Sequence, residues 1–332
     1  MKLRVTAICL LLVTLAGLVL LVVRPSLNPA HVRPLPLIAL GWIAFLTAAF
    51  LLRKVSVRLA VALILLGGIG IQIAAVSAPA RQSDDLYRYV WDGRVQAAGI
   101  DPYAYVPAAA QLDGLRDSFL WHGGADHCLS AAFVRAHPSA DLVPGCTLIN
   151  RPSVPTIYPP VAEAYFLAVH YEPSGNSSTT PIQATTAFIA VLTTVLLLFG
   201  LGRLGRDVRT AALWSWCPTV ALEAGNSAHV DVVAVGIAAA ALLVLATARS
   251  RLSTALGGVL LGLAIATKVT PALVVPAVLA RGDDPLRPPR EGMRRRWMTV
   301  VVSASSAFFV VYVPHVLAVG SKVIGFLPGY LQ

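Results

Sequence analysis

The chain has few charged residues, and acidic residues are especially scarce. Only 13% of its 332 residues are charged, and 16 aspartates and glutamates stand against 26 lysines and arginines, which gives a formal net charge of +10. Hydrophobic residues make up 57% of the sequence, and the mean hydropathy is +0.73. This composition excludes an ordinary soluble domain, because apolar runs of membrane-spanning length recur along the chain. The sequence therefore predicts an all-α, polytopic integral membrane protein.

Cysteines are few, and one common nucleotide-binding motif is missing. The sequence has no Walker-type glycine loop, so the usual motif of ATP-driven transport is lacking. Cys9 and Cys217 lie in apolar runs and are expected to be inert packing residues. Cys128 and Cys146 lie in a long loop, where an oxidising compartment would permit a disulfide between them. No cofactor is predicted, and the need for a divalent metal is left open because no ligand spacing is diagnostic.

Hydropathy predicts about nine membrane spans. The clear runs are Val5–Val23, Pro36–Leu52, Leu59–Ala78, Pro181–Gly202, Val230–Ala246 and Met298–Val319. Shorter runs, which suit short or tilted helices, are Thr210–Leu222, Leu252–Thr267 and Val269–Ala280. This pattern divides the chain into N-terminal spans at residues 1–78, an external loop at residues 79–180 and a transmembrane bundle at residues 181–332.

Basic residues gather at alternate ends of these runs. They are Lys2, Arg4, Arg53, Lys54, Arg58, Arg203, Arg206, Arg209, Arg249, Arg251 and the arginines between Arg281 and Arg296. The positive-inside rule makes this side cytoplasmic. We therefore expect a multi-pass plasma-membrane protein with a cytoplasmic N-terminus. The net charge is interpreted as a topology signal, and no nucleic-acid partner is predicted.

The most polar segment, Ser83–Tyr105, directly follows an apolar run. It holds four carboxylates, two arginines and five aromatic rings. Acids beside a membrane are costly unless they are solvated, paired or used. Ser83 is a good N-cap with acids in the first turn behind it, and Gly99 suits the position after the last turn. The segment therefore predicts an amphipathic helix at the external membrane face, and a surface helix that its acids merely cap is the alternative.

Proline stiffens a second polar part of the same loop. The sequence N-R-P begins at Asn150, and Y-P-P begins at Tyr158. Proline fixes its own backbone, so the ring and hydroxyl of Tyr158 are expected to project from a rigid segment. The apolar run Val161–His170 that follows is expected to form a re-entrant or interfacial helix.

Further polar residues are predicted to reach the external face. Glu223, Asn226 and His229 recur at about helical spacing and can share one helix face. Alternatively, Asn226 or Ser227 caps the next helix. Lys268 lies at the end of an apolar run, where it can either snorkel to the interface or bind a phosphate as a point charge.

These motifs resemble those of the GT-C superfamily of membrane glycosyltransferases, and most of all glycosyltransferase family 87 and the actinobacterial α-mannosyltransferases. The resemblance is carried by S-D-D-L-Y-R-Y-V-W-D-G-R-V-Q-A-A-G-I-D-P-Y, N-R-P-S-V-P-T-I-Y-P-P-V-A, G-N-S-A-H-V-D-V and A-T-K-V-T-P, which span Ser83 to Pro271. It implies a GT-C-like helical bundle whose long external loop bears juxtamembrane helices. The relatives continue beyond G-F-L-P-G-Y-L-Q, so the resemblance also implies a chain that is shortened at its C-terminus and whose activity as it stands is in doubt.

The resemblance also implies a reaction. The enzyme would move a sugar, expected to be mannose, from a polyprenyl-phosphate donor to a cell-envelope glycan or lipoglycan acceptor. The transfer would take place among membrane lipids at the external, periplasmic face. Direct displacement predicts inversion, so a β-linked donor would give an α-linked product.

Site residues follow from this chemistry. A carboxylate suits the general base that takes the proton of the acceptor hydroxyl, with Asp85 the first candidate and Asp84 the second. Arg88, Arg151 and Lys268 are the candidates to bind the donor phosphate, a leaving group that needs charge stabilisation. The residues expected to line the substrate pocket are Tyr87, Trp91, Asp92, Arg94, Tyr103, Asn150, Tyr158, Glu223, Asn226, His229 and Asp231.

Two other classes of protein remain open at this point. A lipid or sugar transporter would have the same spans, but transporters keep polar residues at the membrane midplane, whereas here they lie at the predicted external ends. An inactive partner subunit of a glycosyltransferase would have the same motifs. It would tolerate substitution of the acid pair at residues 84 and 85.

Overall fold

The predicted apolar runs form helices in the computed structural model of the chain. The structure describes residues 2–23, 35–80, 83–121, 147–279, 291–325 and 329. Within these residues there is no strand beyond an isolated antiparallel bridge between Trp121 and Thr147. The prediction of an all-α membrane protein is confirmed.

The long helices match the clear runs to within a few residues, except that α14 begins earlier. They are α1 (Lys2–Val23), α2 (Leu35–Leu52), α3 (Val57–Val76), α8 (Thr180–Arg203), α11 (Asp231–Thr247) and α14 (Glu291–Val319). Of the ambiguous runs, one forms α12 (Arg251–Ile265). The others break into η3 (Val208–Ala211), α9 (Ala212–Ser215) and α10 (Pro218–Ala221), and into η5 (Thr270–Val274) and α13 (Val275–Leu279). A proline stands in the first turn of both α10 and η5. Proline lacks the N–H that would continue a preceding helix, so each run breaks there and a new helix begins.

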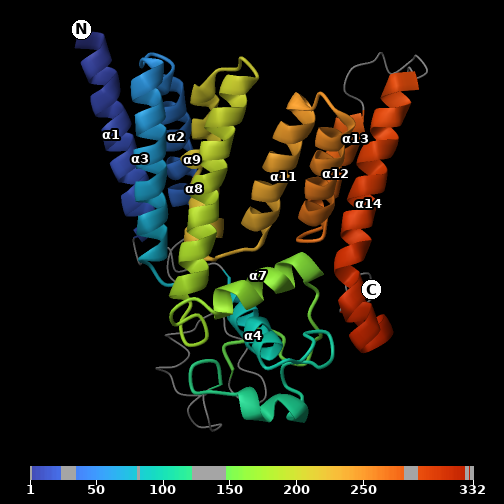
Figure 1. Cartoon of the computed structure of the whole chain (residues 1–332). Coiled ribbons are helices and arrows are strands. Elements are labelled where there is room, and N and C mark those ends of the chain that lie inside the picture. The colour runs from blue at the N-terminus through green and yellow to red at the C-terminus, as the bar shows by residue number, and fades with distance from the viewer. Residues whose placement is uncertain are drawn as a thin grey trace. The chain divides into compact units, whose positions relative to one another are not determined.

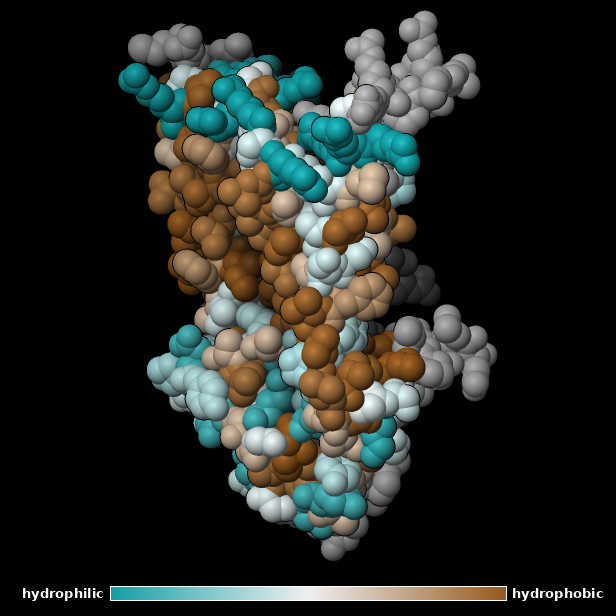
Figure 2. Space-filling view, turned by 45° about the vertical axis from the view of Figure 1, so that its right-hand side comes forward, coloured by the Kyte–Doolittle hydropathy of each residue, from teal (hydrophilic) through white to brown (hydrophobic). Residues whose placement is uncertain are grey.

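Several described helices can cross a membrane. By length and composition they are Val57–Val76, Thr180–Arg203 and Gly292–Ile324, and Pro218–Asn226 with Asp231–Thr247 can form one more, broken span. Their outer faces are apolar, as Phe188 and Phe309 illustrate, each being 65% exposed. Hydrophobic side chains cover the helices and hydrophilic ones gather at helix ends (Figure 2). The chain is therefore a membrane protein, and the larger number of spans stays a prediction.

The chain divides into two compact units, each built from segments that are distant in sequence. Unit 1 comprises Met1–Val90, Asp117–Asn150 and Glu172–Val232, and unit 2 comprises Trp91–Arg116, Arg151–Tyr171 and Val233–Gln332. One boundary between the units falls inside α4 (Asp85–Ala97), and another falls near the start of α11.

In unit 1, α3 packs against α1 and α8 (Figure 1). A buried cluster that includes Leu11, Phe45 and Ile64 joins α1, α2 and α3. A Cβ atom at Gly68 would lie 2.1 Å from Ser215 Oγ, so this glycine permits the close approach of α9 to α3. Ser215 Oγ then donates a hydrogen bond to the Ile64 carbonyl at 2.9 Å.

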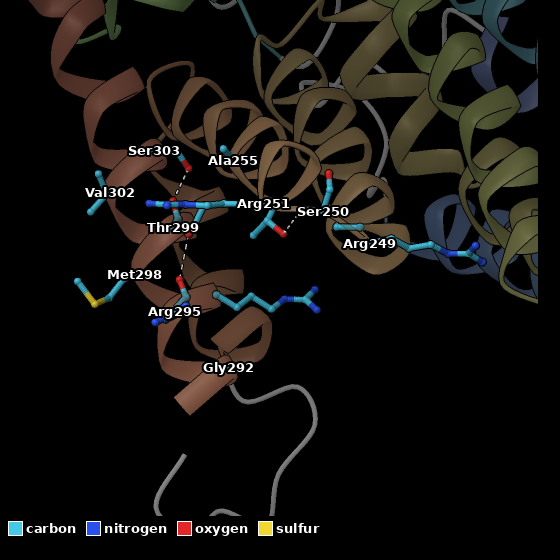
Figure 3. Close-up of a pocket in the computed structure, with 13 residues that line it drawn as sticks. Arg249, Ser250, Arg251, Ala255, Gly292, Arg295, Met298, Thr299, Val302 and Ser303 are labelled. Atoms are coloured by element: carbon cyan, nitrogen blue, oxygen red, sulfur yellow. Dashed lines mark hydrogen bonds between the residues drawn. The ribbon is translucent and has the colours of Figure 1, made fainter. Parts of the chain in front are cut away.

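In unit 2, α12 and α14 pack closely through small residues (Figure 1). A Cβ atom at Gly262 would lie 2.2 Å from the Ala304 carbonyl oxygen. The end of α12 also contacts α7 (Pro160–His170), since the Val161 N–H donates to the Ala266 carbonyl at 3.1 Å. Towards the other ends of α12 and α14 lies a cavity of about 760 Å³ (Figure 3).

Candidate active site

The helix predicted to begin at the acid pair is confirmed as α4 (Asp85–Ala97). Ser83 Oγ accepts a hydrogen bond from the Asp85 N–H at 3.2 Å, so the serine satisfies the start of the helix while Asp84 precedes its first residue. Gly99 has a φ of +76° and the Ile100 N–H donates to the Val95 carbonyl at 3.2 Å, which is a glycine-terminated helix end. Local sequence therefore fixes both ends of α4 and places the two carboxylates at its start.

Asn150 connects the two carboxylates in unit 1. Its Nδ2 atom donates to Asp84 Oδ1 at 2.8 Å and to Asp85 Oδ1 at 2.6 Å. One amide group can do this because it carries two hydrogens. Asn150 thus holds the two neighbouring carboxylates together, although like charges on adjacent side chains repel.

His229 lies on the other side of Asp85. Its Nε2 atom is 3.9 Å from Asp85 Oδ2, and its Nδ1 atom is hydrogen-bonded to Glu223 Oε2. The side chains of His229, Asp85 and Glu223 are 20%, 34% and 36% exposed, so all three can meet a substrate. Asp84, Asp85, Asn150, Glu223 and His229 are called the acid–imidazole cluster below.

An unusual backbone brings Glu223 and His229 together. Residues Leu222–Asn226 form a π-helical turn, η4, and the His229 N–H donates to the Glu223 carbonyl at 2.7 Å. Between them Ala228 has a φ of +54°, in the left-handed region that residues other than glycine rarely adopt. A regular helix would have put the two side chains on one face, as the sequence predicted. Here the chain instead bends by 117° between Pro218–Asn226 and Asp231–Thr247, and the two side chains are hydrogen-bonded to each other.

The surroundings of His229 change its acidity. Burial lowers the pKa of His229, but the hydrogen bond to Glu223 and the charges of Glu223, Asp85 and Asp231 together raise it above the ordinary histidine value. The imidazole therefore keeps its proton to a higher pH than a solvent-exposed histidine. Burial and the charge of Asp84 raise the pKa of Tyr87, which lies on α4 beside the cluster.

Other predicted residues of unit 1 have positions outside these contacts. Asn226 is 1% exposed, and its Nδ2 atom donates to the carbonyls of Ala75, Ala78 and Pro79 at 3.3, 3.2 and 2.8 Å. It thus holds the end of α3 and does not cap α11, which begins at Asp231. Arg88 is 5% exposed on α4, one turn after Asp85. A role for either residue in substrate binding stays a prediction.

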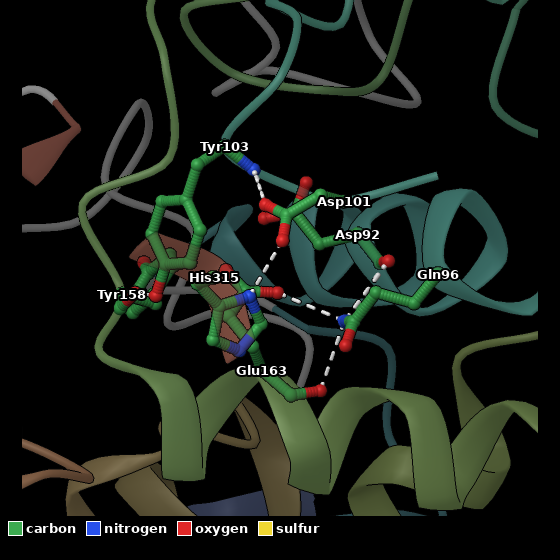
Figure 4. Close-up of polar contacts among 7 residues, drawn as sticks. All are labelled: Asp92, Gln96, Asp101, Tyr103, Tyr158, Glu163 and His315. Carbon is green, nitrogen blue, oxygen red and sulfur yellow. Dashed lines mark hydrogen bonds and ion pairs between the residues drawn. The ribbon is translucent and has the colours of Figure 1, made fainter. Parts of the chain in front are cut away.

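Unit 2 brings Tyr158 and Lys268 together. Lys268 Nζ lies 5.7 Å from the centre of the Tyr158 ring, within cation–π range. The Tyr103 hydroxyl donates to the Tyr158 carbonyl at 2.6 Å (Figure 4). Burial raises the pKa of Tyr103, and the charge of Glu163 adds to this shift. The hydroxyl therefore stays a donor at any physiological pH.

The remaining predicted residues of unit 2 are placed as follows. Trp91 and Asp92 are 1% and 2% exposed on α4, so neither is freely open to solvent. Arg94 Nη1 donates to the Leu115 carbonyl at 3.1 Å. Arg151 is exposed and has a φ of +46°.

The sequence did not predict a buried cluster of polar residues around Glu163. This residue is 0% exposed on α7, yet its Oε1 atom accepts from Thr156 Oγ1 at 2.8 Å and its Oε2 atom accepts from Gln96 Nε2 at 3.0 Å. Nearby, His315 Nδ1 contacts Asp101 Oδ2 at 2.8 Å (Figure 4). A lone glutamate in the apolar run Val161–His170 was the available signal, because such an acid needs partners.

Some predictions are not tested by these contacts. Cys128 and Cys146 lie outside the described residues, whereas Cys9 and Cys217 are free thiols. No group of three or more metal-ligating side chains is arranged to hold an ion within the described part of the chain. None of the predicted site residues lines the cavity of about 760 Å³.

These observations define an all-α membrane protein that carries a cluster of carboxylate, amide and imidazole groups beside the start of α4. A family model described as glycosyltransferase family 87 matches residues 156–331, about half of the chain. The chain belongs to this family and is a glycosyltransferase. The match includes Glu223 and His229 but begins after Asp84, Asp85 and Asn150. Comparisons with curated proteins and with solved structures found no significant match.

Proposed function

We propose that this glycosyltransferase moves mannose from a polyprenyl-phosphate donor to a cell-envelope glycan or lipoglycan at the external membrane face. The acid–imidazole cluster is the observation that carries the proposal. Asp85 is partly exposed, and its two oxygens are contacted separately by Asn150 at 2.6 Å and by His229 at 3.9 Å. A carboxylate held in this way is suited to act as a general base.

In the proposed reaction, Asp85 takes the proton of the acceptor hydroxyl. The hydroxyl oxygen then bonds to the anomeric carbon of the sugar, while the bond from that carbon to the phosphate oxygen breaks. The phosphate leaves with the electron pair, so the configuration at the anomeric carbon inverts. His229 does not touch the reacting atoms in this scheme. Its imidazole lies beside the Asp85 carboxylate and orients it, and Glu223 in turn orients the imidazole.

A departing phosphate needs positive charge near it. Arg88, Arg151 and Lys268 are the proposed donors of that charge. Lys268 has a defined position, because its ammonium lies over the Tyr158 ring and Tyr103 fixes the Tyr158 backbone. Its role is independent of which acid acts as base.

The proposal is tested by sugar transfer in membranes that contain the full chain. Radiolabelled polyprenyl-phosphate mannose is supplied, and transfer is compared between the parent and the Asp85→Asn and Asp84→Asn variants at equal abundance. Asp85→Asn keeps the shape of the side chain and removes the base, so the rate should fall by about 10²–10⁴-fold. The matched control is Asp113→Asn, because Asp113 is an exposed acid that pairs with Arg116 at 2.7 Å.

Each outcome has one meaning. Loss in Asp85→Asn with an active Asp113→Asn control supports the proposal. Loss only in Asp84→Asn moves the role of base to that residue. Equal transfer by the parent and both variants contradicts the acid pair as the catalytic site. Uptake of the labelled lipid without transfer would favour a transporter.

A further inference from the structure

A cavity in unit 2 is lined by arginines at one end and apolar side chains at the other. Its volume is about 760 Å³, and it lies between α12, the turn before it and the first half of α14 (Figure 3). Arg249, Arg251, Arg295 and Arg296 line it. No carboxylate is among the described residues that line the cavity, so its fixed charge there is positive.

The polarity of the cavity changes along α14. Arg295 lies in the first turns of the helix, whereas Val302 lies seven residues later, about 10 Å further along the axis at 1.5 Å per residue. Met298 and Val302 are 57% and 60% exposed. Because α14 is one of the helices able to span a membrane, its exposed apolar side chains face lipid. The cavity therefore offers charge at the helix end and an apolar wall towards the membrane interior.

Local contacts fix the elements that carry the arginines. Ser250 caps α12 in a capping box with Ser253, which orders the turn between Arg249 and Arg251. Arg296 Nη2 donates to the Leu245 carbonyl at 2.6 Å and so ties α14 to the end of α11. Arg296 thus has a structural use, and the backbone that carries the other arginines is held in place before any ligand binds.

We propose that this cavity binds an anionic phospholipid. The guanidinium groups of Arg251 and Arg295 hold the phosphate of the headgroup, since guanidinium forks match phosphate oxygens. An acyl chain lies along Met298 and Val302. Basic pockets between membrane helices recognise anionic headgroups by this combination of charge and apolar surface. A soluble phosphate would match only the charged end. The inference does not depend on the proposed sugar transfer.

Binding is measured on the purified full chain in detergent. Dioleoylphosphatidylglycerol, dioleoylphosphatidylcholine and glycerol 3-phosphate are titrated in turn, and lipid adducts by native mass spectrometry and the shift in Tm are recorded. The anionic lipid is expected to bind saturably and raise the Tm, while the zwitterionic lipid and glycerol 3-phosphate leave both readouts near baseline. Equal binding of the two lipids would overturn the proposal. Full competition by glycerol 3-phosphate would also overturn it, in favour of a soluble phosphate site.

Two neighbouring arginines supply a matched pair of variants. Arg295 lines the cavity and Arg294 does not, although both are exposed on α14. Arg295→Gln should weaken binding of the anionic lipid about tenfold through the loss of a charged hydrogen bond, and Arg294→Gln should leave it unchanged. Equal weakening by both would show diffuse attraction to the basic surface and refute the site. Ala255→Phe, which fills the cavity, should abolish saturable binding. If this variant fails to fold, the comparison of Arg295→Gln with Arg294→Gln tests the site on its own.

Discussion

Asp85 is held from two directions by side chains that sit beside strained backbone. Arg151, which follows Asn150, has a φ of +46°. Ala228, which precedes His229, has a φ of +54°. A left-handed conformation at residues such as these costs of order 1–3 kcal/mol each. Such conformations persist only where other contacts over-determine them. Their position next to the residues that contact Asp85 supports the assignment of the acid–imidazole cluster as the catalytic site.

Asn150→Ala should lower the rate of sugar transfer while leaving the fold intact. The variant removes the donor to Asp84 and Asp85, so the two carboxylates repel without compensation and lose their orientation. We expect kcat to fall about ten- to a hundredfold with little change in KM, because Asn150 positions the base. Steady-state kinetics at equal abundance check this, with Asn176→Ala, an exposed amide in unit 1, as the control. An unchanged kcat would mean that Asn150 has no positioning role.

His229 should make the stability of the protein depend on pH. Its folded pKa is raised, so the stabilisation from its protonated form is complete below its ordinary pKa and is lost as pH rises through the raised value. The gap in Tm between the parent and His229→Gln should therefore shrink as the pH rises above the ordinary histidine pKa of about 6.5. Thermal unfolding in detergent measures this gap. Glu223→Gln should reduce the pH dependence, because the hydrogen-bonded negative charge is gone, and a gap independent of pH would contradict the prediction.

In unit 2, helices α4 and α7 pack closely against each other. A Cβ atom at Gly93 would lie 2.5 Å from the Phe166 carbonyl oxygen and 3.0 Å from its carbonyl carbon. Glu163 on α7 accepts from Gln96 on α4, so the same interface carries a buried carboxylate. Close backbone approach and a buried polar contact together fix how these two helices meet.

Gly93→Ala should therefore destabilise the protein. The added methyl group meets backbone atoms, which cannot rotate away, so α4 and α7 must separate, at a cost of about 1–3 kcal/mol. The fall in Tm or in the free energy of unfolding measures the effect. Gly114→Ala is the matched control, since a Cβ atom there would meet nothing within 4 Å. Equal stability of the two variants would show that the interface relaxes freely.

The sequence predicted α4 well because its signals are local. Ser83 and Gly99 mark its ends by short-range backbone chemistry, and the structure has both. It could not predict the pairing of Glu223 with His229, which requires the π-helical turn and left-handed Ala228. Helical periodicity assumes a regular helix, and nothing in an alanine indicates a positive φ. The contact of Asn150 with residues some sixty-five positions earlier is likewise a tertiary contact, which no local pattern encodes.

At the scale of the whole molecule, α3 and α8 define two ends of unit 1. At one end Gln183 Nε2 is 3.4 Å from the Ala78 carbonyl oxygen, and at the other Arg209 Nη2 donates to the Val55 carbonyl at 2.8 Å. The two helices therefore run antiparallel. The Gln183 end continues into α4 and carries the acid–imidazole cluster, while the Arg209 end carries basic residues. The positive-inside rule predicts that the Arg209 end faces the cytoplasm.

Cysteine labelling should place the two ends of α8 on opposite sides of the membrane. In a background with Cys9, Cys128, Cys146 and Cys217 replaced by alanine, Ser177→Cys marks the cluster end and Arg206→Cys marks the other. Both positions are exposed. The α8 helix of 24 residues is about 36 Å long at 1.5 Å per residue, enough to cross the hydrocarbon core.

A membrane-impermeant maleimide applied to intact cells should label Ser177→Cys and leave Arg206→Cys unlabelled until the membrane is opened. Inverted vesicles should show the reverse pattern, which controls for differences in thiol reactivity. The opposite result in both preparations would put the acid–imidazole cluster in the cytoplasm. Donors and acceptors would then have to be sought on that side, because a polyprenyl-phosphate sugar presented externally could not reach Asp85. Labelling of both positions from outside would mean that α8 does not cross the membrane, since an impermeant reagent reaches a single face.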